Sequence, residues 1–160
     1  MIVFAGLDIS LEETHICVVD ADGNRLKETR VPTEPEPIVQ VLQSLKNQLK
    51  RVGFEASSLS PWLSNELIKQ GFPVIIVEAR HMASALSAMR NKTDRNDAQG
   101  LAQMMRTGWF RRVHVKSNES HRLRVLLSNR RLLKRKFIDI ENAIRGTLKV
   151  FGVVHGPSVL

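Results

Sequence analysis

The sequence predicts an α/β fold, in which a mixed five-stranded sheet with flanking helices is followed by a long amphipathic helix. Three observations support this. Three segments of strand length come first, with no helical run between them, which indicates an antiparallel meander. Two later apolar runs are each preceded by a helical run, which indicates strands parallel to the first. Residues 119–151 then keep helical periodicity throughout.

The predicted first strand is the apolar run Ile2 to Ile9, which carries Asp8 near its carboxyl end. Burying an ionised carboxylate is costly unless it is paired or bound to metal. Asp8 therefore needs such a partner, unless the strand ends before it and leaves it in water. The second and third strands are expected at residues 14–19 and 25–31, joined by the turn-forming residues 20–24.

Closely spaced prolines predict that residues 32–37 form a loop and neither a helix nor a central strand. A short strand, Val52 to Ala56, carries Glu55 and is expected to run parallel to the first. A helix is predicted before this strand, because the following apolar residues recur at helical spacing: Ile38, Val41, Leu42, Leu45 and Leu49.

The next predicted helix runs from about Pro61 to Gln70, and Gly71 ends it. Residues 73–77 form a β-branched run typical of a buried strand, and residues 80–89 are expected to be helical. In sheets with parallel strands, ligands gather beyond the carboxyl ends of those strands. Asp8 and Glu55 should therefore be neighbours at that edge.

The stretch Arg90 to Ala98 places Asp94 and Asp97 three residues apart where an apolar helical pattern begins. Both should lie in the first turn of that helix, with their side chains on one face. Aimed at two further carboxylates, they can hold divalent metal. Alternatively, they only cap the helix and complement the positive end of its dipole.

The formal net charge of +8 and the isoelectric point near 10.3 indicate a polyanionic partner. The excess is uneven, because residues 106–149 hold thirteen Lys or Arg and three Asp or Glu. The single cysteine, Cys17, excludes an internal disulfide and fits a reduced, buried thiol in the cytoplasm. No run is long enough for a membrane span or resembles a signal peptide, so no membrane partner is expected.

The predicted last helix is longer than a compact domain of this size needs. Its apolar stripe is expected either to face another chain or to fold back on its own domain. A cluster of basic residues along it is dense enough to favour phosphate contact over a merely solvated face: Arg130, Arg131, Lys134, Arg135 and Lys136. Trp109 and Phe110, just before this helix, are expected to pack, although they are also suited to stacking on a base.

Three motifs carry a resemblance to a known family: Gly6-Leu7-Asp8-Ile9, Phe54-Glu55-Ala56 and the stretch from Arg90 to Ala98. Together they resemble the catalytic domain of the IS110-family transposases, which is similar to the RuvC resolvases of the ribonuclease H-like superfamily. The chain departs from the family at Ser57-Ser58, where Thr-Gly is usual, which leaves the local turn open. It also stops at Leu160, so the family's C-terminal serine domain is expected to be absent.

The resemblance implies a RuvC-like catalytic domain over residues 1–115, a coiled-coil or dimerisation helix over 116–152 and a tail over 153–160. It implies that Mg²⁺ or Mn²⁺ is the cofactor and that DNA is the substrate, with an element-encoded guide RNA as a further partner in many members and assembly as a homodimer or higher oligomer. Lys92 and Arg95 are expected to contact nucleic acid. The implied catalytic and metal-binding set is Asp8, Glu55, Asp94 and Asp97.

Two other functions remain open. A sugar kinase or actin-like ATPase begins with a similar strand and hairpin, but it needs a glycine-rich phosphate loop and a duplicated domain, and this sequence has neither. The other alternative is a non-catalytic module that binds nucleic acid and dimerises. Measured metal affinity would distinguish it from the catalytic domain. The histidines, His15 among them, show no metal-ligand spacing and are expected to be packing or surface residues.

Overall fold

The computed structural model describes residues 1–78 and 94–153, with the backbone alone described at residues 94 and 95. The chain divides into two compact units, Met1–Val115 and Lys116–Leu160. The helix predicted for residues 80–89 lies outside the described residues. No helix among those described is long and apolar enough to cross a membrane.

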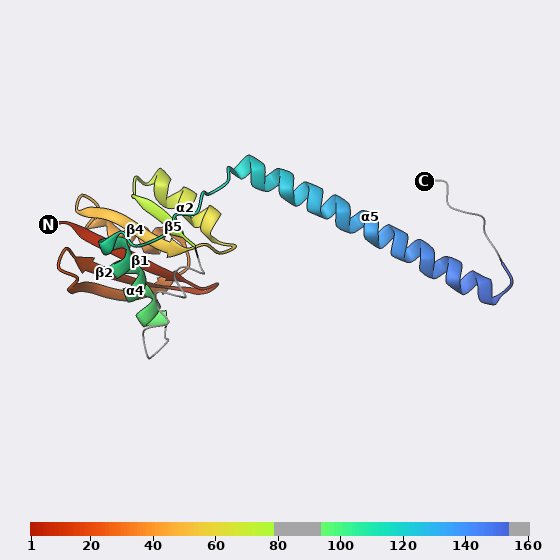
Figure 1. Ribbon diagram of the computed structural model, residues 1–160, viewed down its shortest axis with the longest axis horizontal. Coiled ribbons are helices and arrows are strands. Elements are labelled where there is room, and N and C mark those ends of the chain that lie inside the picture. Colours follow the sequence, from red (N-terminus) through yellow and green to blue (C-terminus); the bar gives the residue numbers. More distant parts are fainter. Residues whose placement is uncertain (79–93, 154–160) are drawn as a thin grey trace. The chain divides into compact units, whose positions relative to one another are not determined.

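The first unit is built on one five-stranded sheet with the strand order β3-β2-β1-β4-β5 (Figure 1). The first three strands pair antiparallel, and β4 and β5 run parallel to β1, as the sequence predicted. The strands are β1 (Val3–Ile9), β2 (Glu13–Asp20), β3 (Arg25–Pro32), β4 (Leu49–Glu55) and β5 (Val74–Val77).

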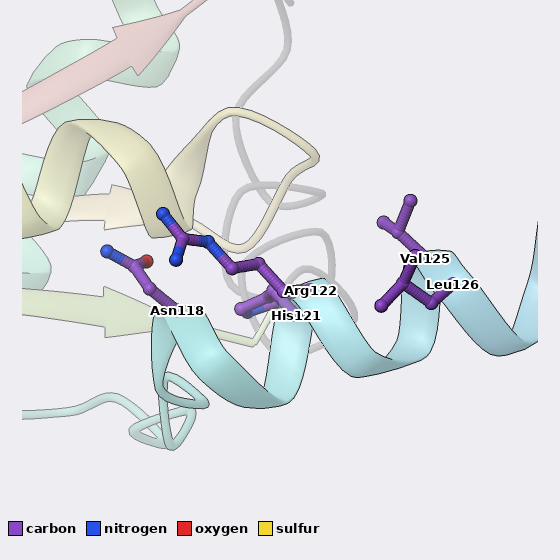
Figure 2. Close-up of a pocket in the computed structure, with 5 residues that line it drawn as sticks. All are labelled: Asn118, His121, Arg122, Val125 and Leu126. Carbon is purple, nitrogen blue, oxygen red and sulfur yellow. The ribbon is translucent and has the colours of Figure 1, made fainter.

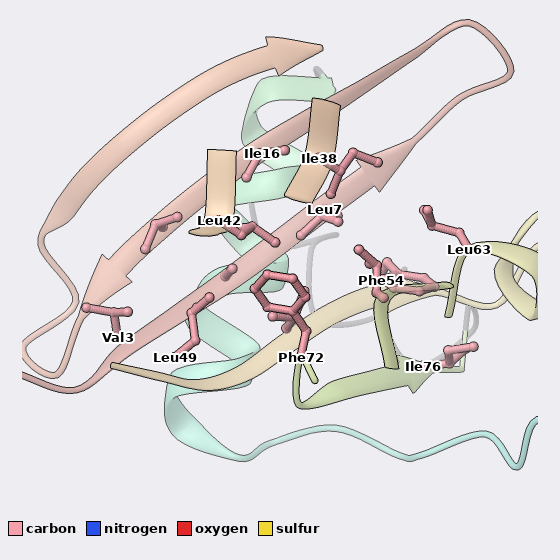
Figure 3. Packing of buried hydrophobic residues seen from close by; sticks show 14 residues of the cluster. Val3, Leu7, Ile16, Ile38, Leu42, Leu49, Phe54, Leu63, Phe72 and Ile76 are labelled. Carbon is pink, nitrogen blue, oxygen red and sulfur yellow. The ribbon is translucent and has the colours of Figure 1, made fainter. Parts of the chain in front are cut away.

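Helices cover both faces of the sheet. On one face, α1 (Pro35–Gln43) and α2 (Ser60–Lys69) contribute buried side chains to a cluster with β1, β2, β4 and β5. On the other face, α4 (Asp94–Thr107) packs on β1, β2 and β4. Figure 3 shows the first cluster, which includes Leu7, Ile16, Ile38, Leu42, Phe54, Leu63 and Ile76.

Two predicted boundaries are wrong. Pro35 and Pro37 lie in the first turn of α1 and not in a loop, because a helix's first N–H groups have no partner within the helix and a proline there costs no bond. The helix also ends at Gln43, and Leu49 begins β4. Leu49 is buried in the same cluster as Ile38 and Leu42, so its apolar character fits a strand as well as a helix.

The close packing of α4 depends on Gly6. A side-chain carbon at Gly6 would collide with the backbone of Ala98 and Ala102. At its far end α4 reaches the β2–β3 turn, where Gln103 Nε2 donates to the Gly23 carbonyl over 2.8 Å. That turn adjoins the start of β1, since Val3 pairs with Asp20. The helix therefore runs antiparallel to β1, and its N-terminus lies toward the carboxyl end of that strand.

The outer edge of β5 is covered by the segment that follows α4. Val77 forms an antiparallel bridge with Arg112, and the Val113 N–H donates to the Ile76 carbonyl over 2.8 Å. Arg111 also forms an ion pair with Glu78 at 3.5 Å. The sheet edge at β5 is thereby paired with backbone, which protects it from association with another strand.

The described part of the second unit, residues 116–153, contains one helix, α5 (Asn118–Val150), of 33 residues. The Ser117 side chain caps its start by accepting a hydrogen bond from the Ser120 N–H at 3.2 Å. The helix corresponds closely to the prediction and spans about 50 Å at ~1.5 Å per residue. None of its side chains is buried.

Candidate active site

Asp8 and Glu55 occupy neighbouring positions at the carboxyl ends of β1 and β4. Leu7 pairs with Phe54, and the two carboxylates are the next residue on each strand. Side chains alternate between the faces of a strand. Leu7 and Phe54 point into the cluster under α1 and α2, so Asp8 and Glu55 belong to the face that α4 covers. Both residues are half-buried.

The backbone of Glu55 is fixed by the turn that follows it. Ser60 Oγ donates to the Glu55 carbonyl over 2.7 Å and accepts a hydrogen bond from the Ser57 N–H at the same distance. The Ala56 N–H donates to the Val77 carbonyl over 2.9 Å. Ser57 is thus part of a well-bonded turn that holds Glu55 at the end of β4.

Asp94 and Asp97 lie in the first turn of α4, as predicted. Ala98 packs directly over Gly6, two residues before Asp8, so the start of α4 lies toward the carboxylate end of β1. Asp97 is half-buried, and the side chain of Asp94 lies outside what the structure describes. Among the described side chains, no group of three or more His, Cys, Asp and Glu is placed to hold a metal ion. The complete four-carboxylate set therefore stays a prediction.

The chemistry of the donors fits Mg²⁺ or Mn²⁺. Carboxylate oxygens are hard ligands, which these ions prefer over sulfur or imidazole. Three of the expected ligands, Asp8, Glu55 and Asp97, are half-buried and can keep contact with ions and water. The N-terminal end of α4 also favours negative charge beside it.

Residues 5–152 match the family of IS110-type DEDD transposases, described as "Transposase". The chain belongs to this family. It is 28% identical over 148 residues to the transposase for insertion sequence element IS1111A of Coxiella burnetii. That alignment covers 92% of this chain and 39% of the relative, so the chain spans less than half of the relative's length.

Solved structures place the fold of this IS110-family chain with RuvC. Thermus thermophilus RuvC matches with a TM-score of 0.52 and 15% identity, covering 70% of this chain and all of that chain. A structure of T. thermophilus RuvC in complex with a Holliday junction substrate gives a TM-score of 0.51, also at 15% identity, and covers 71% of this chain and 100% of that one. At this identity the likeness shows the fold, and the predicted RuvC-like fold is confirmed.

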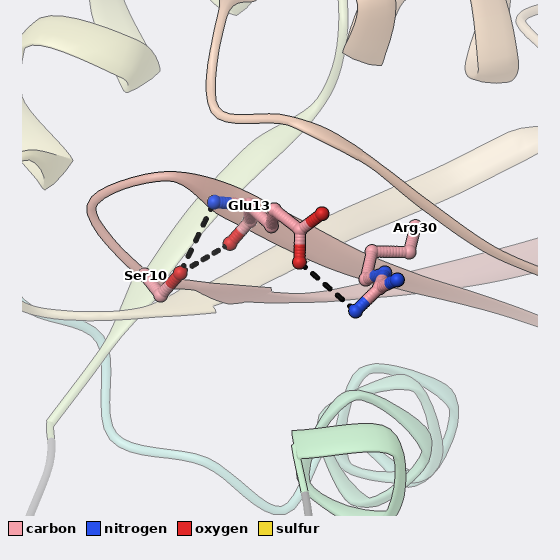
Figure 4. A network of polar contacts seen from close by, with 3 residues as sticks. All are labelled: Ser10, Glu13 and Arg30. Atoms are coloured by element: carbon pink, nitrogen blue, oxygen red, sulfur yellow. Dashed lines mark hydrogen bonds and ion pairs between the residues drawn. The ribbon is translucent and has the colours of Figure 1, made fainter.

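Two residues in register with Asp8 were not singled out by the sequence as site residues. His15 pairs directly with Asp8 across β1 and β2, and is half-buried. Arg30 pairs with His15 across β2 and β3, and it forms an ion pair with Glu13 at 3.0 Å. Figure 4 shows this ion pair beside the Ser10–Glu13 hydrogen bonds of the β1–β2 hairpin. Their relation to Asp8 is visible only in the strand register.

The predicted nucleic-acid contacts of the IS110-family chain fall into two groups along the sequence. Lys92 is outside the described residues, and for Arg95 only the backbone is described. The five predicted contacts on α5 are all exposed, and Lys136 Nζ lies 3.8 Å from Asp139 Oδ2. Of the aromatic pair before α5, Phe110 packs on the core under α4, whereas Trp109 is 63% exposed.

The apolar stripe of α5 follows a heptad pattern. Its first turns present Asn118, His121, Arg122, Val125 and Leu126 in succession (Figure 2). Seven-residue spacing then relates Leu123, Arg130, Phe137, Ile144 and Phe151, and also Leu126, Leu133, Ile140 and Thr147. We call these two rows the seam. Every Leu, Ile and Phe of the seam is more than half exposed, between 54% for Leu123 and 76% for Phe151.

Proposed function

We propose that this chain is the metal-binding catalytic domain of a DNA transposase, acting on DNA phosphodiesters. The observation that carries the proposal is the placement of Asp8 and Glu55 on adjacent parallel strands, on the face that α4 covers. Asp94 and Asp97 lie in the first turn of α4. Membership of the IS110 family supports the same assignment.

In this proposal the carboxylates hold Mg²⁺ or Mn²⁺, which when bound supplies charge stabilisation at the attacking and leaving oxygens of a phosphodiester. Asp8 and Glu55 are fixed by the sheet, so their separation is set before any metal enters. Asp94 and Asp97 depend on the docking of α4 over Gly6. The sheet therefore supplies two rigid ligands, and the helix supplies two whose position follows its packing.

We further propose that α5 joins two copies of the chain through the seam. Exposed apolar residues at heptad spacing are the pattern by which helices form coiled coils. The basic residues beside the seam would contact DNA, or a structured guide RNA, through phosphates, and such contacts carry no base information. Arg130 stands in the seam itself, where a charge weakens association while helping to fix the register.

Calorimetry with Mn²⁺ tests the catalytic proposal. The chain should bind the ion, its melting temperature should rise with added metal, and Asp8→Asn should weaken both effects. Asp22→Asn, in the distant β2–β3 turn, is the matched control and should leave them unchanged. Absence of metal binding by the unmodified chain would instead support a non-catalytic module that binds nucleic acid and dimerises.

A further inference from the structure

A single row of residues crosses the whole sheet at the level of Asp8 and Glu55. Arg30 pairs with His15, and His15 pairs with Asp8. Asp8 lies beside Glu55, because the preceding residues pair. Glu55 then pairs with Val77, and Val77 forms a bridge with Arg112. We call this the edge row: Arg30, His15, Asp8, Glu55, Val77 and Arg112.

All members of the edge row belong to the face covered by α4. Residues that pair directly across a sheet have their side chains on the same face. Val77 packs in the cluster under α4, which assigns Arg112 to that face. On the other side, Cys17 packs in the same cluster, and His15 lies two residues before it on β2, so His15 and its partner Arg30 share the face.

Charge along the edge row is symmetrical. Two carboxylates occupy the centre, and an arginine lies two strands away on each side. Strands are about 4.8 Å apart, so each arginine backbone is about 10 Å from the nearer carboxylate and the row is about 24 Å long. Both arginines are exposed. Glu13 fixes Arg30 through a 3.0 Å ion pair without burying it, since the Arg30 side chain is 58% exposed.

We propose that Arg30 and Arg112 bind phosphates of one nucleic-acid strand that crosses the sheet along the edge row, on either side of the phosphodiester held at Asp8 and Glu55. This inference rests on the proposed metal-binding function. Without metal, the central carboxylates repel a phosphate backbone; with divalent ions bound, the whole row becomes attractive. Arginine suits this role because its planar guanidinium matches phosphate oxygens.

Metal dependence therefore distinguishes DNA binding along the edge row from DNA binding by the basic surface of α5. Contacts made by α5 are independent of metal, whereas contacts along the edge row should add to affinity only when the carboxylates hold an ion. Each phosphate contact contributes about 0.9 to the slope of log affinity against log salt. Two arginine contacts should add close to twice that amount in the presence of metal.

The test uses the full 160-residue chain and a fluorescein-labelled DNA duplex, with fluorescence anisotropy measured over a range of salt in Ca²⁺ and in EDTA. Arg30→Gln and Arg112→Gln should each weaken binding in Ca²⁺ by about three- to tenfold and lower the salt slope by about 0.9. Neither should change binding in EDTA. Calorimetry should show metal affinity unchanged or tighter, because a neighbouring cation has been removed.

Matched controls lie on the same two segments. Arg25→Gln removes an ion-paired arginine from the other end of β3, where it pairs with Val19. Arg111→Gln removes the arginine next to Arg112, which is bound to Glu78. Neither should alter the metal-dependent part of DNA binding, and melting temperatures would verify that all variants fold.

The two proposals fail differently. Suppose that the chain binds Ca²⁺ and that DNA binding rises with metal, but that Arg30→Gln and Arg112→Gln behave like the controls. The proposed phosphate contacts of the edge row are then wrong, and the proposed metal site is retained. Equal losses of DNA affinity in Arg111→Gln and Arg112→Gln would also refute these contacts, because the strand register assigns only Arg112 to the edge row. If the unmodified chain binds no divalent metal, both the proposed catalytic function and the proposed phosphate binding along the edge row are refuted.

Discussion

At the scale of single residues, the strand register separates two glutamates that the sequence places at similar strand ends. Glu55 ends β4 beside Asp8, whereas Glu78 follows β5, one strand further out, and pairs with Arg111. Glu55→Ala should therefore weaken Mn²⁺ binding by at least about tenfold, since loss of even an outer-shell partner of a metal costs that much. Glu78→Ala should change it little. The reverse pattern in calorimetry would reassign the ligand to β5.

Asp20 provides a pH-dependent test of the β2–β3 turn. Its pKa lies below the ordinary value for aspartate, first because the Asn24 side chain donates to its carboxylate at 3.1 Å, and also because backbone N–H groups of Asn24 and Asp22 do so at 2.8 and 2.9 Å. A carboxyl group whose pKa is lower in the folded state than in the unfolded state stabilises the fold at pH values above its unfolded-state pKa, about 3.9. That stabilisation is lost as the pH falls through the folded-state pKa.

Asp20→Asn should accordingly lower the free energy of unfolding at neutral pH, and the deficit should shrink below about pH 4. Urea unfolding at several pH values measures this. Asp22→Asn, in the same turn, is the control, because its carboxylate accepts none of the described hydrogen bonds of the turn. A deficit for Asp20→Asn that stays constant down to pH 2 would show that the ionised carboxylate is not the stabilising species.

At the scale of elements, the docking of α4 over Gly6 directs the first turn of the helix, which carries Asp94 and Asp97, toward the carboxyl end of β1. A side chain at Gly6 would meet the backbone of α4, which cannot move aside, whereas a side chain at Gly53 would meet the flexible end of Met105. Gly6→Ala should cost about 3 kcal/mol or more, and Gly53→Ala about 1 kcal/mol. Chemical denaturation gives both values. Gly6→Ala should also weaken metal binding more than its loss of stability explains.

Element boundaries show why part of the fold could not be predicted. Strand order followed from the alternation of apolar runs, but the end of α1 did not, because Leu49 is apolar in the right phase for both helix and strand. The start of α1 was missed because closely spaced prolines indicate a loop unless they occupy a helix's first turn. The proximity of Asp8 and Glu55 could be predicted, because each lies near the carboxyl end of one of two parallel strands. The positions of His15, Arg30 and Arg112 could not, because their relation to Asp8 exists only in the register.

At the scale of the whole molecule, the proposed metal site and the proposed association surface belong to different units. Unit 1 (Met1–Val115) holds both buried clusters, and α5 in the second unit buries no side chain. A helix with an exposed apolar seam is expected to associate with another helix that buries the seam, because a contiguous apolar surface in water is unfavourable. Changes confined to the seam should therefore alter the oligomeric state without altering the melting of the first unit.

The last prediction uses apolar residues on and off the seam of α5. Phe137→Ser with Ile144→Ser should dissociate the oligomer, because both are seam positions, 56% and 55% exposed. Leu132→Ser with Ile138→Ser removes similar apolar surface from the same helix but off the seam, and should leave association intact. Arg130→Leu should strengthen association, since it replaces a charge in the seam with an apolar side chain. Sedimentation at several concentrations measures all three, and equal dissociation by the two serine pairs would mean that general hydrophobicity, and not the heptad seam, holds the chains together.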